Sequence, residues 1–387
     1  MMKPGKLALF LVTVAVGCGG TTSENVQPVL ETYASNLHAM YSAAVVDEMN
    51  FSAKVEAFLA APTEANLGVA RDAWIASRAN YMLTEGARFY GGPIDGDPTR
   101  HEAAINSWPL DEAYIDYTTN SMTKAVDDTA GIVNNPGLLA TVDFAGLDAL
   151  NAKGGDTNIS DGYHAVEFLL WGQALVDVGP GTRPATDYVA GGPRPNVDRR
   201  KAYLRAAVAG VLFHLMAVRD AWAPSAPYRT SFVAGGMSSV ALALTGLGKT
   251  SKGELAGQRL NAPYASKSRR DQHDCFSSLT LTDYSRDARG LLGLYLGSYG
   301  SNDGPGFDVL VRAANPAIDA KLEAQLQASV SAMDAIPKPF EASIVGDDSS
   351  PGRAAIRAVV TSLRSQGDQL SEAAAALGLT IVVPDEN

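Results

Sequence analysis

The sequence predicts an all-α protein made of two helical bundles packed side by side. Apolar residues recur in alternating steps of three and four along its long segments, and strand-like alternation is essentially absent. This spacing collects apolar side chains on one face of a helix, and helices with such faces pack into bundles. Of the 387 residues, 46% are hydrophobic, which is enough apolar material for two cores.

The first 18 residues predict a secretory signal peptide. Lys3 and Lys6 precede an apolar stretch from Leu7 to Val16, and small residues follow. The segment Ala15-Val16-Gly17-Cys18 resembles a bacterial lipobox, which implies cleavage before Cys18 and lipidation of its thiol.

Residues 19–25 are expected to form a flexible tether between the lipid and the folded protein. The chain is therefore expected in the bacterial cell envelope, lipid-anchored at the periplasmic side of the outer membrane or at the cell surface. Cys275 is the only cysteine besides Cys18, so no intramolecular disulfide is expected in the mature protein.

The apolar pattern predicts helices in two groups, separated by the Gly/Pro-rich stretch 172–198. This loop is the expected boundary between an N-terminal bundle, 26–198, and a C-terminal bundle, 199–387. Thr63 is the expected N-cap of the second helix. The expected helices are 29–60, 63–90, 111–131 and 162–171 before the boundary, and 204–222, 229–260, 280–298, 316–335 and 356–377 after it.

The charge distribution argues against a nucleic-acid partner. The net charge is −11, and the 31 basic residues are scattered along the chain rather than gathered in a stripe. No segment after the signal is predicted to span a membrane, so the lipid anchor is the expected membrane contact.

The segment GYHAVEFLLWGQ, 162–173, places His164 and Glu167 on one face of a helix that is apolar on every other side. A helix that is apolar all round is buried, and two unpartnered ionisable groups would cost several kcal/mol there. They must therefore bind each other, an arginine or a metal ion. A His–Glu hydrogen bond that braces two helices is as consistent with the sequence as a metal site.

Other polar groups are weaker candidates. Arg78 and Glu85 lie on one helical face, where a solvated ion pair is the simpler interpretation. Asp111 and Glu112 follow Pro109 as acids often do at the start of a helix.

The segment RRDQHDCFSSLT, 269–280, gathers Asp271, His273, Asp274 and Cys275, which suggests either a second metal-facing loop or a plain polar loop. In contrast, HEAAI at 101–105 begins like a zinc-protease helix but has Ile105 where the second histidine is required.

GYHAVEFLLWGQ resembles the GxHxxE signature of the imelysin family. AWIASRANYMLTEGARFYGGPID, INSWPLDEAYIDY, GPGTRPATDY, KGELAGQRL and HDCFSSLT resemble further blocks of its iron-regulated-protein branch, in order. The resemblance implies two helical bundles, an envelope lipoprotein and a role in bacterial iron acquisition. It also carries the label of peptidase family M75.

Carried over to this sequence, the signature falls on His164 and Glu167 as metal ligands, with no catalytic residue assigned. Matching blocks suggest a site where the bundles meet, lined by Arg78, Glu85, Asp111, Glu112, Asp271 and His273. Carboxylates with imidazole suit iron, which the resemblance favours, and also manganese or zinc.

The resulting hypothesis is an envelope lipoprotein that binds a divalent cation or a small chelate between two bundles and serves an iron transporter. The first alternative is a metallopeptidase that uses the same motif. A peptidase needs a third ligand and a general base, and the spacing of the sequence indicates neither, so an enzyme is not favoured. The second alternative is a structural or partner-binding lipoprotein without metal.

Overall fold

The computed structural model describes residues 23–96, 98 and 100–385, and it is helical as predicted. Helices account for 65% of the structure and strands for 2%. Cys18, the signal peptide and residues 19–22 lie outside the described residues. The first helix, α1 (Ser23–Ala60), begins inside the segment that was expected to be a tether.

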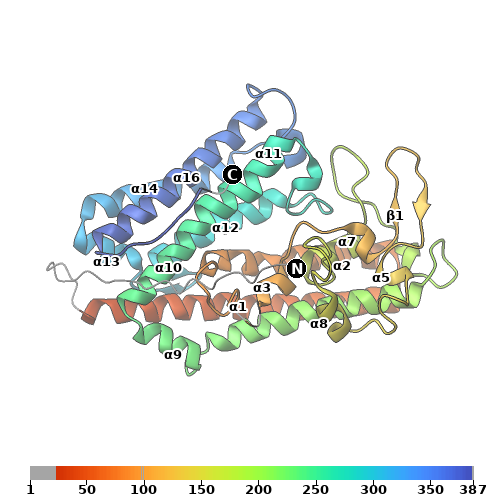
Figure 1. The fold of residues 1–387 in the computed structure, drawn as a ribbon, viewed down its shortest axis with the longest axis horizontal. Helices are drawn as coiled ribbons and strands as arrows, with labels where there is room; N and C mark the ends of the chain where they lie inside the picture. The colour runs from red at the N-terminus through yellow and green to blue at the C-terminus, as the bar shows by residue number, and fades with distance from the viewer. Residues whose placement is uncertain (1–22, 97, 99, 386–387) are drawn as a thin grey trace, which may run out of the picture.

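One group of helices is built on α1. It packs along α2 (Glu64–Tyr81) and α8 (Val197–Ala221), and the motif helix α7 (Gly162–Trp171) packs against both α2 and α8. Figure 1 shows α1 and α8 running side by side along the long axis of the molecule. Short helices cover α8: α3 (His101–Ile105), α5 (Gly131–Asn134) and α6 (Phe144–Leu150), with α4 (Glu112–Ile115) packed on α5.

A second group lies across the first, above it in Figure 1. Its long members are α10 (Met237–Lys249), α12 (Thr280–Leu296), α14 (Pro316–Asp334) and α16 (Pro351–Ala376). Smaller elements complete it: α11 (Ala262–Ser266), α13 (Phe307–Ala314) and α15 (Phe340–Ser343). Helix α9 (Pro227–Ala234) connects the two groups. The division of the sequence at residue 198 stays a prediction; α8, which begins there, packs against α1, α3 and α7.

A π-helix, η3 (Thr250–Asn261), continues directly from α10 and packs on α16. Three 3₁₀ segments are also present among the described residues: η1 (Met82–Ala87), η2 (Ala185–Tyr188) and η4 (Arg269–Asp271). Two antiparallel hairpins supply the strands, β1 (Thr118–Thr119) with β2 (Val126–Asp127), and β3 (Ser298–Tyr299) with β4 (Asn302–Asp303).

The predicted helix 111–131 is wrong. The helix α4 covers only Glu112–Ile115, the hairpin β1–β2 follows it, and the next helix, α5, begins at Gly131. Asp116 leaves the helical conformation (φ −149°) because its carboxylate binds Arg183 and Arg200, and the side chain of Asn120 accepts two backbone N–H groups to form the hairpin turn. Local hydrophobic periodicity carries no information about these distant arginines.

Helix α7, in contrast, has the predicted bounds. Asp161 caps its start, and Gly172 ends it with a positive φ of 67°. All ten of its residues are buried, which confirms that His164 and Glu167 have no contact with solvent.

By length and apolarity alone, α8 could cross a membrane. The pair formed by α9 and the helical segment 237–266 also passes this test, although the two are bent by 105° relative to each other. In the structure, 56% of the most apolar window of α8 is buried by neighbouring helices. Packing against other helices therefore accounts for its apolar composition.

Candidate metal centre

Glu167 is held on both sides by hydrogen bonds. Its Oε1 accepts the backbone N–H groups of Phe276 (3.1 Å) and Ser277 (2.7 Å), and its Oε2 lies 3.0 Å from Nδ1 of His164. The carboxylate thus ties α7 to the loop before α12. When Glu167 is ionised, Oε2 is an acceptor and favours the His164 tautomer that carries its proton on Nδ1.

The same loop brings a second histidine to the first. Nε2 of His273 lies 3.3 Å from Nε2 of His164, and the ring centroids are 4.4 Å apart. His164, His273 and Asp274 offer ligand atoms that all lie within 4.8 Å of one another, and all three residues are buried. Both oxygens of Asp274 and Nδ1 of His273 make no hydrogen bond.

Arg78 is the cation in direct contact with this group. Its Nε donates to Asp283 (2.8 Å), and its Nη2 lies 3.4 Å from Asp274. The guanidinium also lies over the rings of Trp74 and Tyr163, 5.1 and 4.9 Å from their centroids. Although burial opposes its charged form, the carboxylates of Asp283 and Asp274 raise the pKa of Arg78.

We define the central cluster as Arg78, His164, Glu167, His273, Asp274 and Asp283. Burial, together with neighbouring positive charge, lowers the pKa of both imidazoles well below its ordinary value, so they are neutral. Burial and the nearby Asp274 raise the pKa of Glu167 well above its ordinary value. The same two causes raise the pKa of Asp283 in spite of the ion pair with Arg78. The cluster thus contains three carboxyl groups, those of Glu167, Asp274 and Asp283, and one guanidinium.

A second buried ion network adjoins the central cluster. Glu85 binds both Arg88 (2.6 Å) and Arg259, and Arg259 binds Asp287 (2.8 Å). Although burial opposes it, the two arginines lower the pKa of Glu85 to about 2. The π-helix η3 supplies Arg259, and π-helical geometry often occurs at functional sites.

A family model described as imelysin matches residues 37–370, most of the chain. The chain belongs to the imelysin family. No curated protein matches this chain.

Two solved structures share the fold of this imelysin. One is described as a putative iron-regulated protein A precursor from Parabacteroides distasonis and is 17% identical, with a TM-score of 0.72. The match covers 93% of this chain and 97% of the chain in that structure. The other is an imelysin-like protein from Psychrobacter arcticum that is 12% identical, with a TM-score of 0.64. The match covers 96% of this chain and 100% of the chain in that structure.

The structure brings together four of the residues singled out in the imelysin sequence: Arg78, His164, Glu167 and His273. Glu85 lies in the adjoining ion network. Asp274 and Asp283 were not assigned to the site from the sequence. The sequence did contain a hint for Asp274, because this residue directly follows His273. No sequence pattern pointed to Asp283.

The remaining three predicted residues lie outside the central cluster. Asp111 is exposed and caps α4, and Glu112 accepts a hydrogen bond from Gln173 (3.0 Å). Asp271 lies on η4, and its half-buried side chain has no contact with the cluster among the described interactions.

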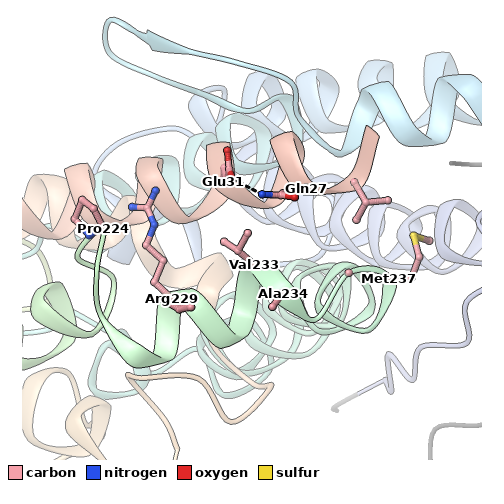
Figure 2. Close-up of a pocket in the computed structure, with 10 residues that line it drawn as sticks. Gln27, Glu31, Pro224, Arg229, Val233, Ala234 and Met237 are labelled. Atoms are coloured by element: carbon pink, nitrogen blue, oxygen red, sulfur yellow. Dashed lines mark hydrogen bonds between the residues drawn. The ribbon is translucent and has the colours of Figure 1, made fainter. Parts of the chain in front are cut away.

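Asp111 and Glu112 do line a cavity of about 160 Å³ next to the cluster, with Trp108, Arg270, Cys275 and Phe276. The Trp108 ring meets His273 edge-on at 5.8 Å. Trp108 therefore lies between the lining of this cavity and the cluster. A larger cavity of about 650 Å³, drawn in Figure 2, lies between the start of α1 and α9, and none of its lining residues belongs to the cluster.

Proposed function

We propose that this imelysin binds a divalent cation in the central cluster, as cargo in iron uptake at the cell envelope. The observation that carries the proposal is the 3.3 Å separation between Nε2 of His164 and Nε2 of His273. Two imidazole nitrogens at about 2.0–2.1 Å from one ion, in tetrahedral geometry, are about 3.3–3.4 Å apart.

The carboxylates around the two rings support the same assignment. Nδ1 of His164 faces Glu167, and Nδ1 of His273 lies 3.6 Å from Asp274 and 3.9 Å from Asp283. Both rings thus turn one nitrogen toward a carboxylate, as metal-binding histidines do, and direct the other toward a common point. If both Nδ1 atoms carry their protons, two lone pairs oppose each other there unless a cation lies between them.

Charge supports the proposal independently. Carboxyl groups outnumber cations in the central cluster, and burial makes their ionised forms costly. A bound divalent cation would supply the missing positive charge, with Asp274 as a third ligand whose oxygens are free of hydrogen bonds. In this arrangement Glu167 orients His164 rather than binding the ion.

Two nitrogens and a carboxylate suit Fe²⁺, Mn²⁺ and Zn²⁺ alike. Iron is favoured because a protein of the same fold is described as iron-regulated. Lipid anchoring at Cys18 and delivery to an envelope iron transporter are part of the proposal, as is the arrival of the cation as a small chelate.

The experiment is metal analysis of the purified chain after anaerobic loading with Fe²⁺, compared with loading by Mn²⁺ and Zn²⁺. The variants His164→Ala and His273→Ala are expected to lose the bound ion. His38→Ala removes a histidine on α1 outside the cluster and is the matched control. Metal content equal to that of the wild type in both cluster variants would refute the proposal.

A metallopeptidase is the rival function for the same residues. It needs a coordination position open to water and substrate, whereas the three candidate ligands here are at most 2% exposed. Cleavage of unfolded protein by the wild type that disappears in both cluster variants, but not in His38→Ala, would favour the rival.

A further inference from the structure

A second group of histidines and carboxylates gathers around Asp161, the residue that caps the start of α7. His214 comes from α8, Asp148 from α6, and Asp161 is the residue that caps α7. One ligand atom from each of these residues lies within 4.8 Å of the others. His101, at the start of α3, contacts His214 from the opposite side.

The contact between the two histidines couples the tautomer of His214 to that of His101. Nδ1 of His101 and Nδ1 of His214 are 2.8 Å apart, so one of them must donate a proton to the other. If His214 donates, its Nε2 keeps a lone pair. That Nε2 lies 3.5 Å from Oδ1 of Asp148 and belongs to a residue that is 5% exposed.

Asp161 supplies a buried oxygen without a partner. Its Oδ1 accepts the N–H of Gly162 (2.8 Å), whereas its Oδ2 makes no hydrogen bond although the residue is 0% exposed. Burial raises its pKa more than the N–H of Gly162 lowers it, and Asp148 raises it further.

Gly210 makes room for this carboxylate on α8, one helical turn before His214. A Cβ atom at residue 210 would lie 2.5–2.9 Å from the Asp161 carboxylate. The absence of a side chain therefore lets Asp161 lie directly against the helix that carries His214.

We propose that Asp148, Asp161 and Nε2 of His214 form a second site for a divalent transition-metal cation, with His101 holding His214 in the required tautomer. An imidazole nitrogen with two carboxylates suits Zn²⁺, Mn²⁺ or Fe²⁺. This outer site is reached from the surface, because the side chain of Asp148 is 49% exposed. It does not rest on the proposed function of the central cluster.

The geometry also gives a new role to the segment HEAAI. Its first histidine lacks a partner one helical turn later, where Ile105 stands. The partner comes instead from α8, 113 residues away in the sequence.

Zn²⁺ binding to the full metal-free chain, measured by calorimetry and by metal content after gel filtration, tests the outer site. The double variant His164→Ala/His273→Ala removes the central cluster and is expected to keep one Zn²⁺. Adding His214→Ala should abolish that binding. Adding Asp161→Asn, which preserves a capping side chain for α7, should weaken it at least tenfold.

Asp156→Asn is the matched control, because it neutralises an exposed carboxylate on the loop that precedes α7 and should leave Zn²⁺ binding unchanged. Urea unfolding verifies that each variant is folded. The proposal is overturned if the folded double variant binds no Zn²⁺, or if His214→Ala leaves its binding intact. Loss of one Zn²⁺ on His214→Ala alone, with none lost in the double variant, would support the outer site and contradict the central one.

Discussion

The replacement of Glu167 by glutamine separates a metal-binding role from a structural one. Oε1 of Glu167 accepts two backbone N–H groups, so the amide oxygen of a glutamine would keep that position. The amide nitrogen must then face Nδ1 of His164 and donate to it. The proton of the imidazole moves to Nε2, which no longer offers a lone pair toward His273.

The expected loss of metal affinity is large, whereas the expected loss of stability is small. Changing a group that orients a ligand typically costs 10- to 100-fold in affinity, or about 1.4–2.7 kcal/mol. Because glutamine keeps the acceptor for the two backbone N–H groups and a hydrogen-bonding partner for Nδ1 of His164, Glu167→Gln should change the free energy of unfolding of the metal-free protein by less than about 1 kcal/mol. Glu167→Ala removes every one of these hydrogen bonds and should cost roughly 2–4 kcal/mol.

The assay combines calorimetric titration with Mn²⁺ or Zn²⁺ and urea unfolding of the metal-free protein. Because Glu167→Gln leaves the outer site untouched, the titration is made in the His214→Ala background. Affinity within twofold of that background would refute the tautomer argument. If Glu167→Gln and Glu167→Ala were equally destabilised, with no metal bound to the parent, the pair would only brace the fold.

Three further predictions follow from the packing and charges. Glu85→Gln should lose roughly 3 kcal/mol of unfolding free energy at pH 7, worked from a pKa lowered from 4.5 to about 2. Since the pKa is lowered on folding, this stabilisation is present above pH 4.5 and is lost as the pH falls toward 2, so urea unfolding of variant and wild type should converge on acidification. Gly290→Ala would place a Cβ 2.3 Å from the carbonyl oxygen of Leu83 and should cost at least about 2 kcal/mol in thermal or urea unfolding, whereas Gly68→Ala, which meets nothing within 4 Å, should be neutral or stabilising. Trp108→Ala removes the ring between the 160 Å³ cavity and His273, so stopped-flow chelation should show faster release of the bound cation; an unchanged rate would exclude this route.

The parts predicted correctly from the sequence depend on neighbours within one or two helical turns. The bounds of α7 follow from the cap at Asp161 and the glycine at 172, and the His164–Glu167 contact follows from their spacing of three residues. Thr63 likewise caps α2 as expected, since its side chain accepts the N–H of Asn66. Local rules are sufficient wherever the contacts are local.

The other half of each site comes from distant sequence. His273 lies 109 residues from His164, and His101 lies 113 residues from His214. The residues between the two members of each pair show no pattern that predicts their contact. A polar loop has the same composition whether it faces solvent or a buried partner. The wrong helix at 111–131 has the same origin, since the arginines that hold Asp116 are 67 and 84 residues away.

Burial limits what the central cluster can do. An ion held by His164 and His273 would be enclosed by Trp108 and by the loop that Glu167 ties to α7, so its exchange requires those groups to move. Enclosure lowers the dielectric and strengthens each metal–ligand interaction, but it also keeps large substrates away. Such a site is better suited to retaining a cation than to repeated turnover of a polypeptide. Asp161 caps α7 and His164 lies in its first turn, so a cation bound at the outer site would act on the helix start that positions the central ligand.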